Sequence, residues 1–275
     1  MLKTRVITAV ILLGLFLPAL FYLPMMWWAS AMLLLTLVCL HEWAGFLRLT
    51  PLHTHFFLIF STLTGIGLLI LLQQWGFHWF FYHALHVFTG MTFFWLIIVP
   101  LAMFYNTFFK QQAFNLFLGW SLMLSLWMAL VTAQEVNPYV LLVIISTIWL
   151  ADSAAYFFGK QFGRHKLAPS ISPGKTWEGV LGALLAVAVY AVTLKATGAV
   201  ATWWILPGLW IITIVGVYGD LFESFFKRRA NLKDSGQFLP GHGGFLDRVD
   251  GVIPALPVGL CLVFWFHYWQ QSYSF

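Results

Sequence analysis

Long apolar runs constrain this chain more strongly than any motif in it. A helix that crosses a bilayer needs roughly 20 mainly apolar residues, and the sequence contains nine stretches of about that length. Hydrophobic residues make up 61% of the chain, well above their share in soluble domains. The sequence therefore predicts an all-α, polytopic membrane protein with about nine transmembrane helices. The expected spans cover residues 6–23, 27–47, 56–72, 87–105, 114–133, 139–159, 178–197, 202–225 and 252–270.

The lysines and arginines predict how these helices are oriented. Nine spans place 13 of the 14 basic residues on one side of the membrane and only Lys195 on the other. Because basic residues gather on the cytoplasmic side, we expect a cytoplasmic N-terminus. One span more or fewer in the middle of the chain would scramble this distribution.

Charge is concentrated in one part of this apolar chain. Residues 219–251 hold five of the nine acidic residues, and basic residues lie between them. Four polar residues of the eighth predicted span are spaced i, i+3, i+4 and i+7, so they share one face of a helix. Such a stripe must face the protein interior or a water-filled cleft, because lipid would leave it unsatisfied. The four residues are Asp220, Glu223, Ser224 and Lys227.

A second polar stripe runs along the sixth predicted span. Asp152, Tyr156 and Lys160 lie one helical turn apart, near its predicted cytoplasmic end. Carboxylates within spans are energetically costly and usually functional, so we expect Asp152 to belong to the same site as Asp220. Glu42 lies at the same depth in the second span. Capping a helix or reaching out to the interface explains Glu42 equally well.

Carboxylates that face clustered basic residues suggest a divalent cation together with phosphates. Asp247 and Asp250 are again i, i+3, just before the last span, with Arg248 between them. Mg2+ prefers oxygen ligands, usually one or two carboxylates completed by water and substrate phosphate. The glycines of residues 240–244 would let backbone N–H groups approach an anion closely. An ion-pair network that ties the loop to the helix is the alternative, but it does not explain the glycines.

A second polar segment, residues 166–179, precedes the seventh predicted span. Ser172, Lys175 and Thr176 lie where that helix begins, and a helix presents free N–H groups and a positive dipole end to an anion there. Glu178 follows at the start of the same span. This pattern favours phosphate binding, with an ordinary capped helix as the alternative.

Five motifs in the second half of the chain resemble those of a known family. They are Asp152-Ser-Ala-Ala-Tyr156, Ser172-Pro-Gly-Lys175-Thr176-x-Glu178-Gly179, Ser224-x-x-Lys227-Arg228, Lys233-Asp234-Ser235-Gly236, and Pro240-Gly241-His242-Gly243-Gly244-x-x-Asp247-Arg248-x-Asp250. Together these motifs resemble the signature of the CDP-diacylglycerol synthase (phosphatidate cytidylyltransferase) family. The resemblance covers residues 152–251, and the first half of the chain is similar to the family only in architecture.

The resemblance implies that CTP and phosphatidate give CDP-diacylglycerol and pyrophosphate in phospholipid biosynthesis. It implies a requirement for Mg2+, with room for a second cation, and a homodimer. We expect CTP, phosphatidate and membrane lipids as partners, and no nucleic acid. We expect the protein to be integral to a bacterial cytoplasmic (inner) membrane, with its active site facing the cytoplasm.

The resemblance also implies roles for individual residues, with Asp220 and Asp247 binding the metal. The expected catalytic residues are Asp220, Asp247, Lys227, Lys233, Asp234, Arg248 and Asp250. The expected substrate- and phosphate-binding residues are Asp152, Tyr156, Ser172, Lys175, Thr176, Glu178, Glu223, Ser224, Arg228, Gly241, His242, Gly243 and Gly244.

These motifs divide the chain into two regions. Residues 1–137 hold about five spans and no motif, and residues 138–275 form a catalytic region with cytoplasmic loops 160–177 and 226–251. A CTP-dependent lipid kinase, or a cytidylyltransferase for an isoprenoid lipid phosphate, would use the same metal and phosphate chemistry. A transporter is a more distant alternative, because it would place polar residues near the midplane, whereas here they stop at the predicted cytoplasmic third.

Overall fold

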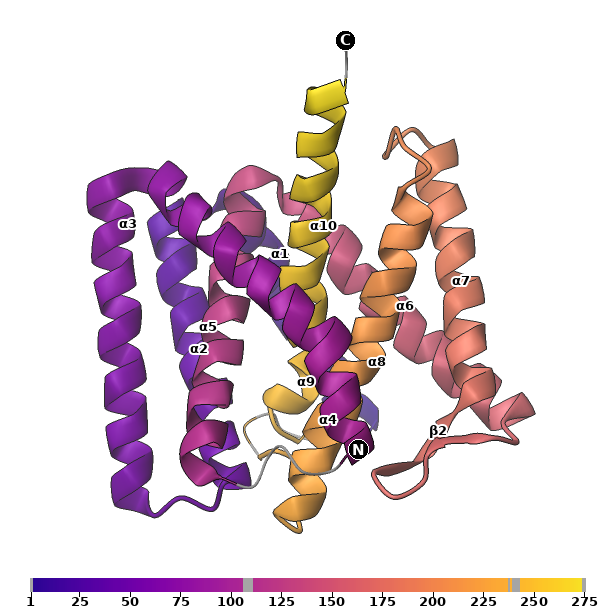
Figure 1. The fold of residues 1–275 in the computed structure, drawn as a ribbon, viewed down its shortest axis with the longest axis horizontal. Coiled ribbons are helices and arrows are strands. Elements are labelled where there is room, and N and C mark those ends of the chain that lie inside the picture. Colours follow the sequence, from indigo (N-terminus) through magenta and orange to yellow (C-terminus); the bar gives the residue numbers. More distant parts are fainter. Residues whose placement is uncertain (1, 106–110, 237, 239–242, 274–275) are drawn as a thin grey trace.

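The computed structural model describes residues 2–105, 111–236, 238 and 243–273, and nearly all of them are helical (Figure 1). The helices are α1 Leu2–Tyr22, α2 Met25–Phe46, α3 Pro51–Phe93, the π-helix η1 Phe94–Ile98, α4 Val99–Tyr105, α5 Gln112–Val136, α6 Pro138–Phe162, α7 Trp177–Ala196, α8 Ile205–Arg229, α9 Leu246–Val249 and α10 Val252–Tyr273. The two short strands are β1 Lys166–Ala168 and β2 Ser172–Thr176.

Seven helices of the described chain are long and apolar enough to cross a membrane. A mainly helical protein with several helices able to span a membrane is therefore confirmed, whereas the count of nine is not. The spans predicted at 56–72 and 87–105 lie in one helical run, Pro51–Met103. Of α1, which covers Leu2–Tyr22, the described side chains form an apolar stretch from Val10 to Tyr22. The side of the membrane on which the N-terminus lies stays a prediction.

The long α3 run bends at Gly76, whose φ of 79° and ψ of 175° are not helical. Only glycine adopts such a backbone conformation without strain. In Figure 1 the first arm of α3 stands upright, and the second descends diagonally toward α4. The run therefore consists of two helical arms that meet at Gly76, and the spans predicted at 56–72 and 87–105 lie in different arms.

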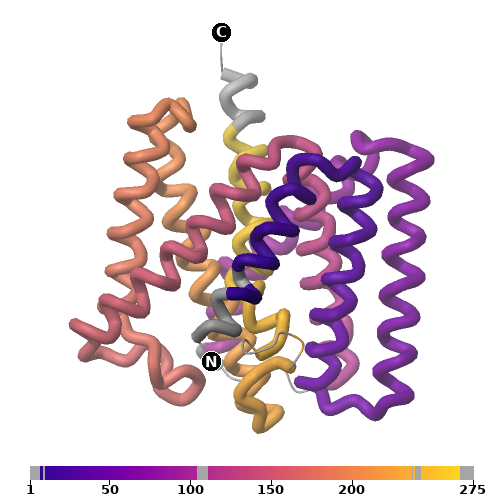
Figure 2. The backbone as a smooth tube through the Cα atoms, turned by 180° about the vertical axis from the view of Figure 1, so that it is seen from behind, coloured from indigo at the N-terminus to yellow at the C-terminus, as the bar shows by residue number. Residues whose placement is uncertain are grey.

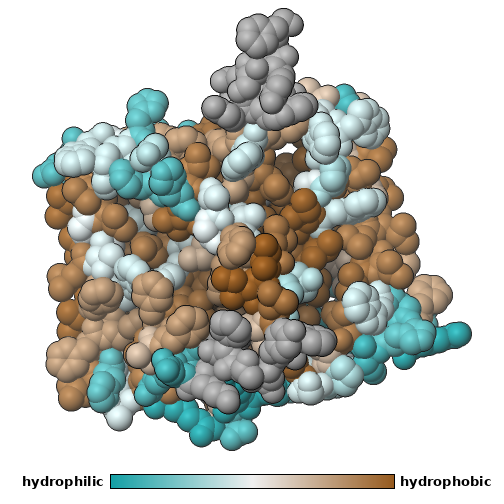
Figure 3. Space-filling model, viewed as in Figure 1, coloured by the Kyte–Doolittle hydropathy of each residue, from teal (hydrophilic) through white to brown (hydrophobic). Residues whose placement is uncertain are grey.

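The surface of the helices agrees with a membrane environment. On α7 the large side chains of Leu181, Leu185 and Val189 are 59%, 62% and 68% exposed, an arrangement that lipid tolerates and water disfavours. Figure 3 shows apolar residues across the body of the molecule and hydrophilic residues gathered along its lower edge. Seen from behind in Figure 2, α7 lies on one flank and the first arm of α3 on the other.

The loop predicted at residues 160–177, between the sixth and seventh spans, contains a small β-hairpin. β1 and β2 are antiparallel, with Lys166 opposite Thr176 and Ala168 opposite Ser172. The hairpin projects beyond the ends of α6 and α7, at the hydrophilic edge of the molecule (Figures 1 and 3). It therefore brings the Ser172–Thr176 segment to the polar end of the protein.

Gly219 lets α8 and α10 approach each other closely beside the candidate site. A Cβ atom added to Gly219 would collide with the backbone oxygen of Asp250 and lie 2.7 Å from Cγ of Pro254. Small residues at helix contacts give membrane helices the tight packing on which their association depends.

We expect Gly219→Ala to destabilise the protein, because the new methyl group has no space between the backbones of α8 and α10. Overpacking of this kind costs about 1–3 kcal/mol, so the melting temperature in detergent should fall. Gly90→Ala is the matched control, since a Cβ there meets no atom within 4 Å. Equal melting temperatures for the two variants would show that the close contact is not required.

Candidate active site

The candidate site lies at the polar end of α8, where the β-hairpin meets the helix. Nζ of Lys175, on β2, lies 2.5 Å from Oδ2 of Asp220, and the hydroxyl of Ser224 donates to Oδ1 of Asp220 over 3.3 Å. One turn farther along α8, Nε of Arg228 donates to the carbonyl of Ile171 over 3.3 Å. The structure thus brings the predicted Lys175 segment onto the polar stripe of α8.

A second lysine joins α8 to α9. Nζ of Lys227 lies 2.7 Å from Oδ1 of Asp247 and 3.2 Å from Oε2 of Glu223. The three side chains are largely buried, with exposed fractions of 13% for Lys227, 10% for Asp247 and 4% for Glu223. An ammonium between two carboxylates compensates charge that would otherwise be costly to bury. These three predicted site residues therefore form one unit.

The second carboxylate oxygen of Asp247 is held by backbone. The N–H groups of Ser235 and Gly244 donate to Oδ2 of Asp247 over 2.9 and 3.0 Å. Gly243 has a φ of +81°, and a Cβ there would lie 3.0 Å from the same oxygen. The anion that the described glycines approach is therefore the carboxylate of Asp247. The predicted residues Gly241 and His242 lie outside the described residues.

Asp152 and Asp250 belong to the same electrostatic neighbourhood. Asp152, on α6, interacts electrostatically with Asp220 and Lys175. Asp250 interacts with Asp220 and Asp152, and its Oδ1 accepts the N–H of Gly251 over 2.7 Å. The expectation that the sixth, seventh and eighth predicted spans share one site agrees with this arrangement.

Glu223 lines a small cavity that also touches Asp250 and Trp95. Oε1 of Glu223 and Nε1 of Trp95 are buried and lack hydrogen-bond partners among the described atoms. The cavity has a volume of about 10 Å³, which is close to the space that one water molecule needs.

Other predicted site residues have local roles. The hydroxyl of Thr176 accepts the N–H of Gly179 over 3.1 Å and so caps α7. Glu178 binds His165, with 2.6 Å between Oε1 and Nδ1, and closes the base of the hairpin. The contact of Thr176 matches the alternative of an ordinary capped helix. Ser172 is the first residue of β2. Tyr156 is exposed, and Nζ of Lys160 lies over its ring. The remaining predicted residues with exposed side chains are Lys233, Asp234 and Arg248.

Glu42 is absent from the predicted site, yet it lies next to Asp247. It is 5% exposed, and its Oε2 accepts the N–H of Leu246 over 2.7 Å and the hydroxyl of Ser235 over 3.1 Å. Its Oε1 accepts the N–H of Phe245 over 3.0 Å. The one signal in the sequence was a carboxylate within an apolar span, which by itself does not say what the carboxylate contacts.

The donor set fits Mg2+ in part. Carboxylate oxygens are the ligands that Mg2+ prefers, and one or two suffice when water and phosphate complete the shell. Within the described residues no group of three His, Cys, Asp or Glu side chains could hold a metal by itself. Asp220 and Asp247 offer two carboxylates, each already paired with a lysine, and Asp220 keeps 34% of its side chain exposed.

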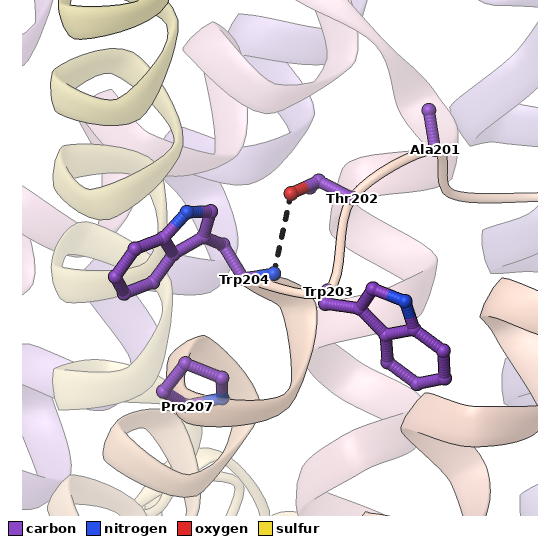
Figure 4. A pocket seen from close by; sticks show the side chains of 5 residues that line it. All are labelled: Ala201, Thr202, Trp203, Trp204 and Pro207. Atoms are coloured by element: carbon purple, nitrogen blue, oxygen red, sulfur yellow. Dashed lines mark hydrogen bonds between the residues drawn. The ribbon is translucent and has the colours of Figure 1, made fainter.

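A pocket at the opposite end of the molecule is a poor candidate for this chemistry. It lies in the loop between α7 and α8, far from the hairpin (Figures 1 and 4). The only hydrogen bond that Figure 4 draws there runs from the N–H of Trp204 to the hydroxyl of Thr202, over 3.2 Å. The lining side chains carry no charge, so they offer nothing that would bind a phosphate or a metal. They are Ala201, Thr202, Trp203, Trp204 and Pro207.

Comparison with known proteins gives a consistent result. Residues 3–266 match the cytidylyltransferase family. A phosphatidate cytidylyltransferase of Haemophilus influenzae is 32% identical, over 94% of this chain and 96% of the relative. Proteins of the same name from Pseudomonas aeruginosa and Thermotoga maritima are each 40% identical, over 53% and 42% of this chain and 56% and 46% of their own lengths.

The family match extends over almost the whole chain, including the helices that carry no motif. The match to the Haemophilus influenzae protein also runs nearly from end to end in both chains. The chain therefore belongs to the cytidylyltransferase family.

Proposed function

We propose that the protein transfers the CMP group of CTP to phosphatidate, giving CDP-diacylglycerol and pyrophosphate. The observation that carries this proposal is the pair of lysine–carboxylate contacts, Lys175 with Asp220 and Lys227 with Asp247, at the polar end of an apolar helical bundle. A soluble nucleotide and a lipid head group can both reach such a place. The names of the relatives point to the same substrates.

The proposed reaction needs no protein nucleophile. A phosphate oxygen of phosphatidate attacks the α-phosphorus of CTP, a new P–O–P bond forms, and the bond to the β-phosphate breaks to release pyrophosphate. Both substrates are anions, so the main task of the protein is to hold them together and offset their charge. Lys175 and Lys227 would contact phosphate oxygens, supported by the basic side chains of Arg228, Lys233 and Arg248.

Asp220 and Asp247 would hold Mg2+, with room for a second cation beside Asp250 and Asp152. When bound, Mg2+ would supply positive charge to the phosphates of CTP. Lys175 and Lys227 would then be shared between these carboxylates and the substrate phosphates. Ser224 and Glu223 would keep Asp220 and Lys227 oriented through the contacts they already make.

The cytoplasmic face of a bacterial inner membrane is the proposed location of the site. Basic residues are concentrated around the site, at the polar end of the molecule. This supports the proposed location, because basic residues favour the cytoplasmic side of a membrane. A homodimer is proposed on the family resemblance alone.

Product analysis with purified protein in detergent tests the reaction. With labelled CTP, Mg2+ and phosphatidate, we expect pyrophosphate and labelled CDP-diacylglycerol in equal amounts, and no turnover without a divalent cation. A panel of lipid phosphates, including an isoprenoid phosphate, checks the lipid. Release of CDP in place of pyrophosphate would identify a kinase and contradict the proposal.

Asp220→Asn and Asp247→Asn should each lower CTP-dependent turnover by at least about 100-fold, because each removes a proposed ligand of the Mg2+ that would offset charge in the transition state. Both variants should remain folded, as judged by their melting temperatures and gel-filtration profiles in detergent. Glu135→Gln, a carboxylate change on exposed α5 surface, is the control and should retain activity. Near-normal turnover in either Asp variant would reject the metal assignment.

Lys175→Ala should mainly weaken substrate binding, because it removes a cation and leaves both carboxylates in place. We expect a higher KM for CTP, for phosphatidate or for both, measured at saturating levels of the other substrate. Lys166→Ala, an exposed lysine on the partner strand of the same hairpin, is the matched control. Unchanged KM values for both substrates in Lys175→Ala would contradict the role of this lysine.

A further inference from the structure

A buried carboxylate from the half of the chain without motifs supports the loop that carries Asp247. Glu42 lies near the end of α2, and the residues it contacts, Ser235 and Phe245–Leu246, are about 200 positions away: the separations are 193, 203 and 204 residues. The side chain of Glu42 accepts three hydrogen bonds, at 2.7, 3.0 and 3.1 Å. Hydrogen bonds to an ionised group are about twice as strong as those between neutral groups.

Ser235 links this carboxylate to the carboxylate of Asp247. Its hydroxyl donates to Glu42 and accepts the backbone N–H of Asp247 over 3.3 Å, and its own N–H donates to Oδ2 of Asp247 over 2.9 Å. The peptide chain between Gly244 and Asp247 is therefore held from two sides. One side is Glu42, through the N–H groups of Phe245 and Leu246, and the other is Ser235.

The loop encloses Glu42 so tightly that a substrate has no room beside it. A Cβ atom on Gly236 would lie 2.5 Å from Oε1 of Glu42, and one on Gly244 would lie 2.8 Å from the same atom. Only 5% of Glu42 is exposed. This side chain consequently acts on other protein groups and not on the reacting atoms.

The helix that carries Glu42 is itself held against α8. The ring of the neighbouring Trp43 lies 4.7 Å from that of Phe226 and stacks on Phe222 at 6.2 Å. Its Nε1 donates to the carbonyl of Asn115 on α5 over 3.0 Å. Glu42 thus projects toward the loop from a helix that is packed against α8 and α5, as a positioning group requires.

Among the described residues, the three partners of Glu42 are all donors, which matches a carboxylate and mismatches a carboxamide. In glutamine an NH2 group takes the place of one of the two carboxylate oxygens. This NH2 group would face a backbone N–H of the loop, and that N–H would then have no acceptor. Loss of even one of these buried hydrogen bonds leaves a donor unsatisfied. Glu42→Gln therefore changes the hydrogen bonding with almost no change in volume.

We propose that Glu42 is a positioning residue that orients the carboxylate of Asp247, through Ser235 and the backbone of residues 244–247. This inference rests on the proposed function, in which Asp247 holds the divalent cation. It gives the N-terminal region a defined part in the site.

Binding of Mn2+ in the presence of CTP, followed by electron paramagnetic resonance, tests this role without turnover. We expect Glu42→Gln to raise the Mn2+ dissociation constant by about 10–100-fold, the range seen when groups that orient metal ligands are removed. Glu135→Gln should match the wild type. An unchanged Mn2+ affinity in Glu42→Gln, or no Mn2+ binding by the wild type, would overturn the inference.

Kinetics distinguish positioning from a simple loss of folded protein. Glu42→Gln should raise the Mg2+ concentration that gives half-maximal turnover. In the Asp247→Asn background it should cause little further loss of turnover, because both changes act on the same carboxylate. A variant that only folds less well would lose activity with the wild-type Mg2+ midpoint, and that result would reject positioning. Wild-type protein that binds Mn2+ but does not release pyrophosphate would reject the proposed function and not this inference.

Ser235→Ala provides a second test if Glu42→Gln yields no folded protein. It removes the hydroxyl that joins Glu42 to Asp247 and leaves the two backbone contacts of Glu42 in place. We expect a shift in Mn2+ affinity and Mg2+ midpoint in the same direction as for Glu42→Gln, but smaller. Wild-type values for both quantities in folded Ser235→Ala would contradict the proposed link.

Discussion

A charged side chain at the end of an apolar helix needs a partner, because neither lipid nor an apolar core can solvate it. Lys227 illustrates how this chain meets the requirement, since its ammonium lies between Glu223 and Asp247. The carboxylate of Asp220 likewise has the ammonium of Lys175 as its partner. The partners come from different elements, so pairing the charges also ties α8 to the β-hairpin and to α9.

Backbone N–H groups supply further partners for the carboxylates. Asp247 and Glu42 both accept hydrogen bonds from the segment that includes Gly244, Phe245 and Leu246. That segment can fold around two carboxylates because glycine leaves space where a side chain would collide. The result is a pair of carboxylates held by neighbouring backbone N–H groups of one loop: Glu42 is enclosed, and Asp247 faces Lys227. In the proposed reaction the enclosed carboxylate supports the other.

The half of the chain without a motif contributes through packing. Glu42 and Trp43 are adjacent in α2. Trp43 packs on aromatic side chains of α8, and Glu42 holds the loop before α10. This arrangement places the carboxylates of the site on elements that cannot shift independently. The match to the cytidylyltransferase family over residues 3–266 includes this supporting half.

The sequence by itself determined the class of the protein, the polar stripe of α8 and the residues that carry the family motifs. Apolar length and helical spacing are local properties, so they can be read without knowing which segments meet. Tertiary structure alone decided the bend at Gly76, the closure of Gly243 and Gly244 on Asp247, and the place of Glu42. Each depends on backbone torsion or on contact between distant segments: Glu42 and Leu246 are 204 residues apart, and nothing in the residues between them indicates that a carboxylate and an N–H group will meet.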